Sequence, residues 1–100
     1  MKHLVIIGAG GMGRSIYCIA KGCIGYNTDF DIKGFIDDDI SSLDSFNNYP
    51  PVLSSIKDYK IKEDDVFTCS IGDVETKINI CRQLINRGAT FYTLIHKNSL

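Results

Sequence analysis

The sequence has no excess of charge of either sign and no long apolar segment. Eleven basic and twelve acidic residues give a formal net charge of −1, whereas binding to nucleic acid or to a membrane surface needs a concentrated basic face. The longest apolar run covers residues 4–7, far short of the roughly 20 residues of a membrane-spanning helix. No signal-peptide cleavage site follows this run. We therefore expect a cytoplasmic protein that binds neither nucleic acid nor membranes.

The side chains that build metal sites and nucleophilic centres are few and poorly spaced. The four cysteines form no Cys-x-x-Cys pair and no zinc-type cluster with histidine; they are Cys18, Cys23, Cys69 and Cys81. Each falls in an apolar stretch, so we expect buried small side chains in a reducing compartment, and Cys18 and Cys23 are poorly spaced for a redox pair. Only two histidines exist, both at expected strand ends. We therefore predict no catalytic residue and no metal site.

The 100 residues have the length and composition of one globular domain, with 44% hydrophobic and 23% charged residues. Apolar runs typical of buried strands alternate with segments of helical periodicity. The expected strands cover residues 3–7, 31–37, 52–53, 65–71 and 90–95, and the expected helices cover residues 12–23 and 74–85, with a helical turn at 54–59. This alternation predicts an α/β, Rossmann-like three-layer domain with a mostly parallel five-stranded sheet in the order 3-2-1-4-5.

Two segments have distinctive patterns. The expected second helix has an apolar face with one further leucine beside it; these residues are Val74, Ile78, Cys81, Ile85 and Leu84. Residues 40–51 form a polar loop that ends in two prolines. Its length is typical of a lid or binding loop, and a solvated linker is an equally good interpretation.

A glycine motif, Gly8-x-Gly10-x-x-Gly13, follows the first expected strand and opens an amphipathic helix. Gly8 permits a tight turn, Gly10 lets backbone approach a ligand, and Gly13 lets the helix pack close to the sheet. The amino end of the helix offers free N–H groups to an anion. The motif lacks Gly-Lys-Ser/Thr, so it is not the phosphate loop of an NTPase. The alternative is a tight turn with no ligand.

An acidic cluster ends the second expected strand, 24 residues after Gly13 (37 − 13). In dinucleotide folds an acidic residue at this point accepts hydrogen bonds from ribose hydroxyls, and a carboxylate could equally accept from a uracil imide N–H. Asp37 is the stronger candidate for such a contact and Asp38 the weaker one. The alternative for all three residues is a solvated loop, which we favour for Asp39.

The next long strand ends in Gly72 and Asp73. In this topology Gly72 faces the glycine motif across the crevice between neighbouring strands and leaves room for a ligand. Asp73 has an alternative role as the N-cap of the following helix. Lys77 and Arg14 each lie within about a turn of a helix start and could reach a phosphate, although a lone lysine on a helix is more often simply solvated, and the same alternative applies to Arg14.

Four stretches in order resemble the N-terminal, PglD-like domain of bacterial sugar O-acyltransferases of the sialic acid O-acetyltransferase NeuD type, which are related to the PglD nucleotide-amino-sugar N-acetyltransferases. The first covers residues 4–14 (Leu-Val-Ile-Ile-Gly-Ala-Gly-Gly-Met-Gly-Arg). The others cover residues 34–39, 70–73 and 91–96. The resemblance extends over essentially the whole chain.

The resemblance implies a Rossmann-like domain that binds a nucleotide-sugar acceptor, UDP-linked, and no cofactor of its own. The implied contacts are Gly8, Gly10, Gly11, Met12 and Gly13 at the phosphates or sugar, Asp37 and Asp38 at the uracil or ribose, and Gly72 and Asp73 along the same cleft. In that family a C-terminal left-handed β-helix of hexapeptide repeats binds acetyl-CoA, carries the catalytic histidine and forms a homotrimer. No such repeat occurs here, so we expect that domain to be absent from these residues.

Several positions depart from the family pattern. Met12 stands where many members have histidine or phenylalanine, and Lys77 stands where arginine is frequent. Lys97 replaces the proline that usually follows the position of His96, where the β-helix would begin. Because the catalytic histidine of the family lies in the β-helix, the resemblance does not make His96 catalytic.

The expected function is a nucleotide-sugar-binding domain of an acetyl-CoA-dependent sugar O- or N-acyltransferase of bacterial surface-polysaccharide biosynthesis. Such a domain would hold the acceptor without transferring the acyl group. The main alternative is an NAD(P)-binding domain of an oxidoreductase or of a dinucleotide-sensing regulator, which the glycine spacing favours and the short chain opposes. A third interpretation is an interaction domain that binds no nucleotide.

Overall fold

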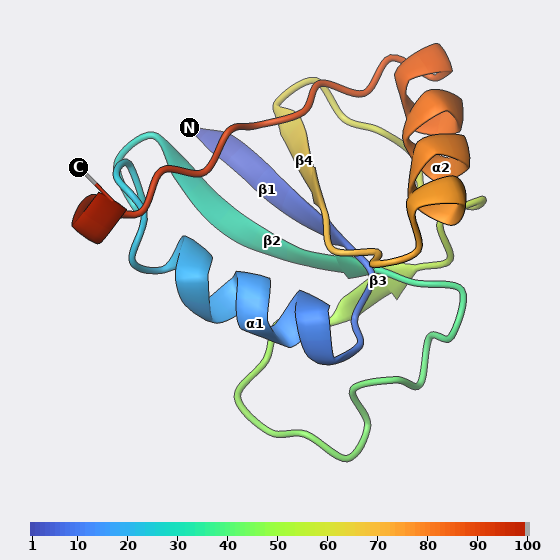
Figure 1. Ribbon diagram of the computed structural model, residues 1–100, viewed down its shortest axis with the longest axis horizontal. Helices are drawn as coiled ribbons and strands as arrows, with labels where there is room; N and C mark the ends of the chain where they lie inside the picture. The colour runs from blue at the N-terminus through green and yellow to red at the C-terminus, as the bar shows by residue number, and fades with distance from the viewer. Residues whose placement is uncertain (100) are drawn as a thin grey trace.

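A parallel β-sheet lies between two helices in the computed structural model, which describes residues 1–99 (Figure 1). The elements in chain order are β1 (Lys2–Ile7), α1 (Gly11–Ala20), β2 (Phe30–Ile36), β3 (Val52–Ser54), β4 (Asp65–Cys69), α2 (Val74–Asn86) and the short 3₁₀ helix η1 (Lys97–Ser99). The strands pair in parallel in the order β3-β2-β1-β4. This confirms the Rossmann-like α/β class and the order predicted for the first four strands. None of the helices in this part of the chain is long and apolar enough to cross a membrane.

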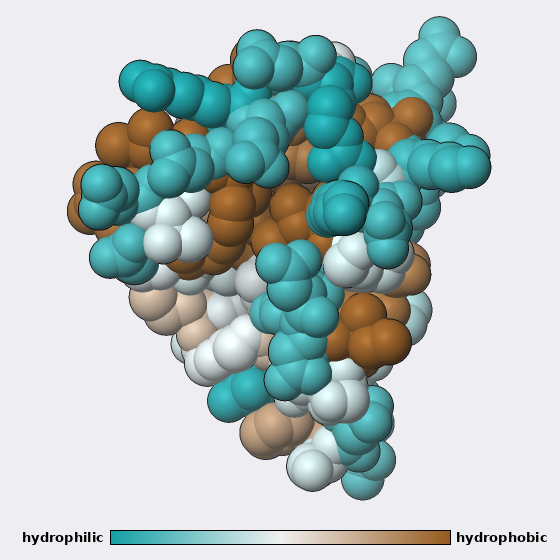
Figure 2. All heavy atoms as spheres, turned by 90° about the vertical axis from the view of Figure 1, so that its right-hand side faces the viewer, coloured by the Kyte–Doolittle hydropathy of each residue, from teal (hydrophilic) through white to brown (hydrophobic). Residues whose placement is uncertain are grey.

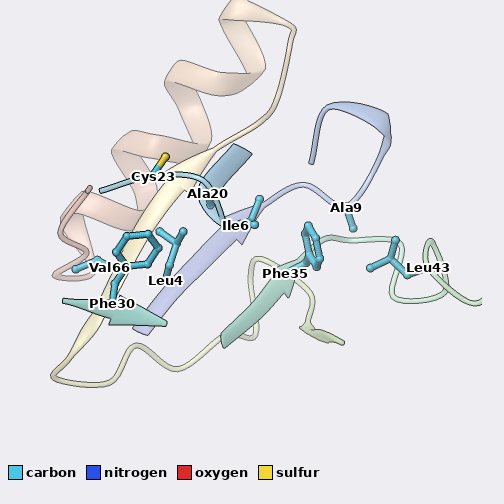
Figure 3. Close-up of a cluster of buried hydrophobic side chains, with 9 residues drawn as sticks. All are labelled: Leu4, Ile6, Ala9, Ala20, Cys23, Phe30, Phe35, Leu43 and Val66. Carbon is cyan, nitrogen blue, oxygen red and sulfur yellow. The ribbon is translucent and has the colours of Figure 1, made fainter. Parts of the chain in front are cut away.

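Two apolar cores lie on the two faces of the sheet, because successive side chains of a strand point to opposite sides. Leu4 and Ile6 of β1 pack in the core on the α1 side, where they lie with Phe35 of β2 (Figure 3). Val5 and Ile7 pack in the core on the α2 side. All four β1 side chains are fully buried. The continuous apolar run of β1 is thus buried on both faces, as the sequence predicts.

The predicted fifth strand at residues 90–95 is wrong. Phe91 forms an isolated parallel bridge with Phe67, on the edge of the sheet where that strand was expected. The chain then leaves β4, and the Ile95 carbonyl oxygen accepts a hydrogen bond of 2.9 Å from the Ile24 amide, in the segment after α1. The Thr90 carbonyl and the Tyr92 amide still bond to Phe67 of β4, each at 2.9 Å, but the backbone from Ile95 onward pairs with the segment after α1.

Some predicted boundaries also differ. The expected helical turn at residues 54–59 is a non-helical turn, in which the Ser55 hydroxyl oxygen accepts a hydrogen bond of 3.2 Å from the Asp58 amide. Helix α1 ends at Ala20, and strand β4 ends at Cys69. Helix α1 ends early because the Gly22 and Cys23 amides bond to the Ile19 and Ala20 carbonyl oxygens, three residues back, in a tight turn.

The apolar face predicted for α2 points largely away from the sheet. Val74, Ile78 and Ile85 are 68%, 44% and 55% exposed, whereas Leu84 is fully buried and Ile80 packs beside it on the sheet. Helix α2 is apolar on two sides, and the pair four residues apart, 80 and 84, forms the packed side. Figure 2 views the molecule from the α2 side and shows apolar patches between polar side chains.

All four cysteines are free thiols with different exposure. Cys23 is buried as expected, and Cys69 and Cys81 are half-buried. The expectation is wrong for Cys18, which is exposed because it lies on the side of α1 opposite Ile16 and Ala20. Helical periodicity puts a residue two positions from the packed face on the solvent side.

Thiol labelling should follow this order of exposure. At about pH 8, Cys18 should be alkylated by iodoacetamide at least tenfold faster than Cys81, because the thiolate is the nucleophile and burial together with neighbouring Cys69 raises the pKa of Cys81 to about 11. Burial also raises the pKa of Cys23. Peptide mass mapping over time measures the four rates, and the urea-unfolded protein, in which the rates should converge, is the control. Equal native rates at Cys18 and Cys81 would contradict the packing described above.

Candidate functional site

The carboxyl ends of β1, β2 and β4 meet at one edge of the sheet, where both α1 and α2 begin (Figure 1). A hollow of about 290 Å³ lies at this edge. The residues that line it are Gly8, Gly10, Gly11, Met12, Gly13, Asp37, Ser70, Ile71 and Gly72. Ligands of open α/β sheets bind at this kind of edge, in the crevice between strands whose connections run to opposite faces. The hollow is therefore the candidate functional site.

The three motif glycines have different structural roles. Gly8 adopts φ +97°, a left-handed conformation that favours glycine. A Cβ on Gly13 would lie 2.8 Å from the Gly8 carbonyl carbon and closer still to its oxygen, so α1 packs against the turn as closely as backbone allows. A Cβ on Gly10 would meet no atom within 4 Å. Gly8 and Gly13 thus shape the turn, and Gly10 faces open space in the hollow.

Ser70 secures the glycine turn from the neighbouring strand. Its buried hydroxyl lies 2.8 Å from the Ile7 carbonyl oxygen and 3.0 Å from the Gly8 carbonyl oxygen, to which it donates. The Ser70 amide also donates to Ile7 at 2.9 Å. Sequence reasoning did not select this residue, although a small hydroxyl at the end of a strand expected beside β1 was a usable signal.

Asp37 connects the glycine turn to the end of β2. One carboxylate oxygen accepts a hydrogen bond of 2.8 Å from the Ala9 amide, and the other accepts one of 2.8 Å from the Asp39 amide. Each carboxylate oxygen can accept two hydrogen bonds, so both retain capacity toward the hollow that Asp37 lines. Asp38 accepts from the Ile56 amide at 3.2 Å and does not line the hollow.

The two helices differ at their amino ends. Helix α1 starts after Gly10 with no side-chain cap and no acidic residue in its first turn. Helix α2 is capped by Asp73, whose carboxylate accepts from the amide and hydroxyl of Thr76 at 3.0 and 2.6 Å. These hydrogen bonds lower the pKa of Asp73. The capping role considered for Asp73 is therefore observed, and the amide groups of α1 are the ones left for another acceptor.

Arg14 and Lys77 do not line the hollow, whereas Met12 does. The Arg14 guanidinium lies over the Phe46 ring, with Cζ 4.0 Å from the ring centre. Lys77 is exposed on α2 and, like Arg14, does not line the hollow. Met12 reaches across the mouth, since its sulfur lies 3.2 Å from the point where a Cβ on Gly72 would stand.

A larger hollow of about 520 Å³ lies at the opposite, amino-terminal edge of the sheet. Charged side chains line it, and four of them form pairs: His3 Nδ1 lies 2.7 Å from Asp31 Oδ1, and Lys33 Nζ lies 3.0 Å from Asp65 Oδ1. Within residues 1–99 no group of three or more His, Cys, Asp or Glu side chains is arranged to hold a metal ion. The larger volume alone therefore does not make this hollow the functional site, because the free backbone N–H donors lie at the other edge of the sheet, beside the glycine turn.

The model of the PglD N-terminal domain family matches residues 3–84 of this sequence. The chain belongs to the PglD N-terminal domain family. The match spans every residue that lines the glycine hollow, and it confirms the resemblance to PglD-like N-terminal domains of sugar acetyltransferases. No curated protein gives a significant match to the sequence.

A solved structure has the same fold as this PglD-type domain. It is the acetyltransferase domain of PglB from Neisseria gonorrhoeae FA1090, with a TM-score of 0.76 and 25% sequence identity. The alignment covers 97% of this chain and 45% of that chain. The PglD-type domain therefore spans less than half of the length of that structure, and it is related to a sugar acetyltransferase.

Proposed function

We propose that this domain binds the acceptor substrate of a sugar acetyltransferase, a nucleotide-linked sugar, with its phosphates at the amino end of α1. The observation that carries the proposal is the contrast between the helices: α2 has its own acidic cap, whereas α1 opens uncapped at a glycine-lined hollow. Free amides and the positive end of the helix dipole favour an anion there. A protein with a net charge of −1 can hold a phosphate in this way without a basic surface.

In this proposal Asp37 supplies a second contact, as a hydrogen-bond acceptor for uncharged donors of the ligand. Its carboxylate is held in place by the Ala9 and Asp39 amides and keeps acceptor capacity for a ribose hydroxyl or a uracil imide N–H. An acceptor beside a phosphate site matches a ligand that combines an anion with hydroxyl or imide donors, as a UDP-sugar does.

The proposed role is acceptor binding, without transfer of the acyl group by this domain. The hollow is lined by five glycines and by Met12, Asp37, Ser70 and Ile71, and the Ser70 hydroxyl already donates to the glycine turn. Activation of an attacking sugar hydroxyl or amine, and binding of the acyl donor acetyl-CoA, are proposed for groups outside these residues.

Titration calorimetry with UDP-N-acetylglucosamine tests the proposal. Wild-type protein should bind with measurable heat, and Gly10→Val should weaken binding at least tenfold, because the added side chain would fill the hollow where backbone approaches the ligand. The variant should stay folded with a melting temperature at most a few degrees below wild type, since a Cβ at Gly10 meets no atom within 4 Å and φ −73° suits any residue, although valine is a poorer N-cap than glycine.

Controls separate the alternatives. Lys60→Ala, on the exposed segment between β3 and β4 and outside the hollow, should leave the affinity unchanged. Failure of UDP-N-acetylglucosamine, UDP and UMP alike to bind would overturn the proposal. Enhanced NADH fluorescence would favour a dinucleotide-binding domain instead, and indifference to every nucleotide would favour an interaction domain.

A further inference from the structure

The long loop between β2 and β3, residues 37–51, is fastened to α1 by aromatic rings. Leu43 inserts into the core on the α1 side. Tyr49 packs on Tyr17 of α1 with ring centres 5.5 Å apart, and Phe46 meets Tyr49 edge-on at 6.2 Å and 89°. The loop therefore has a defined position beside the first turns of α1, which a solvated linker would not need.

Phe46 is 43% exposed, and the group that lies on its ring is the Arg14 guanidinium, at 4.0 Å. The same guanidinium reaches the start of α1, because its Nη2 lies 3.8 Å from the point where a Cβ on Gly11 would stand. No carboxylate within residues 1–99 forms an ion pair with Arg14. The Arg14 guanidinium thus lies between an aromatic ring and the uncapped helix end, and none of its N–H groups forms an ion pair with a carboxylate of the described residues.

We propose that Phe46 is a positioning residue of the anion site, which holds the Arg14 guanidinium at the amino end of α1 for the ligand's phosphate. This inference rests on the proposed function. Stacking on an aromatic face fixes the plane of a guanidinium and leaves its edge free for charge-assisted hydrogen bonds to phosphate oxygens. The loop then contributes to binding through Phe46, and Arg14 adds a directional donor to the backbone amides.

The cation–π pair predicts a specific pattern of UDP affinities. Phe46→Leu keeps an apolar side chain but removes the ring, and should weaken UDP binding about three- to fivefold, as expected for an exposed cation–π contact. Phe46→Tyr keeps the ring and should bind as wild type. Arg14→Ala should weaken binding about tenfold, and adding Phe46→Leu to Arg14→Ala should change the affinity less than 1.5-fold.

Calorimetry with UDP on these four variants, each checked for a wild-type circular dichroism spectrum and melting temperature, completes the test. A Phe46→Leu variant with wild-type affinity, or equal losses with and without Arg14, would overturn the positioning role while leaving the proposed function intact. If wild-type protein binds no UDP, the proposed function fails, and this inference fails with it. A structural role alone would not give rescue by tyrosine together with dependence on Arg14.

Discussion

Alanine in place of Gly13 should destabilise the domain by about 3 kcal/mol or more, the upper part of the usual range for overpacking. The new methyl group would lie 2.8 Å from the Gly8 carbonyl carbon, which is backbone and has no rotamer through which to move away. Gly8 cannot shift freely, because its φ of +97° and the Ser70 hydroxyl fix the turn. Helix α1 must therefore separate from β1, and the core on its side would loosen.

Urea unfolding followed by circular dichroism measures this loss. Gly11→Ala is the matched control, two residues earlier in the same helix: its nearest neighbour would be Arg14 Nη2 at an ordinary 3.8 Å, and alanine is a better helix former than glycine by up to about 1 kcal/mol. The control should therefore be as stable as wild type or slightly more stable. Equal unfolding midpoints for Gly13→Ala and Gly11→Ala would show that the close approach of helix and turn does not exist.

Removal of the Asp65 carboxylate should be the second large perturbation. Its side chain is fully buried at the start of β4. It accepts hydrogen bonds of 2.5 Å from the Tyr59 hydroxyl, 3.0 Å from Lys33 Nζ and 2.9 Å from the Lys62 amide. Burial by itself would raise the pKa of Asp65, but the hydrogen bonds from these three partners outweigh it and lower that pKa.

Asp65→Ala should cost about 3 kcal/mol, because it leaves the buried Tyr59 hydroxyl and the partly exposed Lys33 ammonium without their shared acceptor. The effect should depend on pH. The lowered pKa in the folded state means that the carboxylate's contribution is complete above the ordinary carboxyl pKa of about 4 and is lost as the pH falls through the lower folded-state pKa. The difference in unfolding free energy between wild type and variant should therefore be constant from about pH 5 to 7 and shrink below about pH 4.

The neighbouring Asp64→Ala is the control for this variant. Asp64 is exposed and uses its backbone carbonyl, rather than its side chain, to accept from the His3 amide. Its loss should change stability by less than about 0.5 kcal/mol at any of these pH values. A difference for Asp65→Ala that stays the same down to about pH 2 would exclude the ionised carboxylate as the source of its effect.

The sequence predicted the elements whose signal is local. The apolar run at residues 4–7 could be satisfied only by burial on both faces, and the glycines after it allow a sharp turn into α1. Alternation of strands and helices then restricts the connections to right-handed crossovers, which gives the order of β1 to β4. The motif glycines and Asp37 were found for the same reason, because the carboxyl ends of parallel strands must share an edge, whereas Met12 was named only through the family resemblance.

The predictions that were wrong concern segments that could form hydrogen bonds or packing contacts with either of two partners. Residues 90–95 have a strand-like pattern, but the pattern does not say whether their backbone bonds go to β4 or to the segment after α1. Helix α2 has apolar residues on two sides, and periodicity cannot choose which side meets the sheet. The role of Ser70 was not predicted for a related reason. Its hydroxyl donates to the Gly8 carbonyl oxygen, which is 62 residues away in the chain.

The sequence by itself determined a Rossmann-like PglD-type domain with a glycine turn at the sheet edge, because chain geometry and hydrophobic periodicity act over a few residues. Only the tertiary structure decided which groups at that edge stay free. It commits Asp73 to capping α2, ties Asp37 to the turn and holds Arg14 on Phe46. Each assignment is a choice among hydrogen-bond or stacking partners distant in the chain, and only packing of the folded molecule settles such a choice.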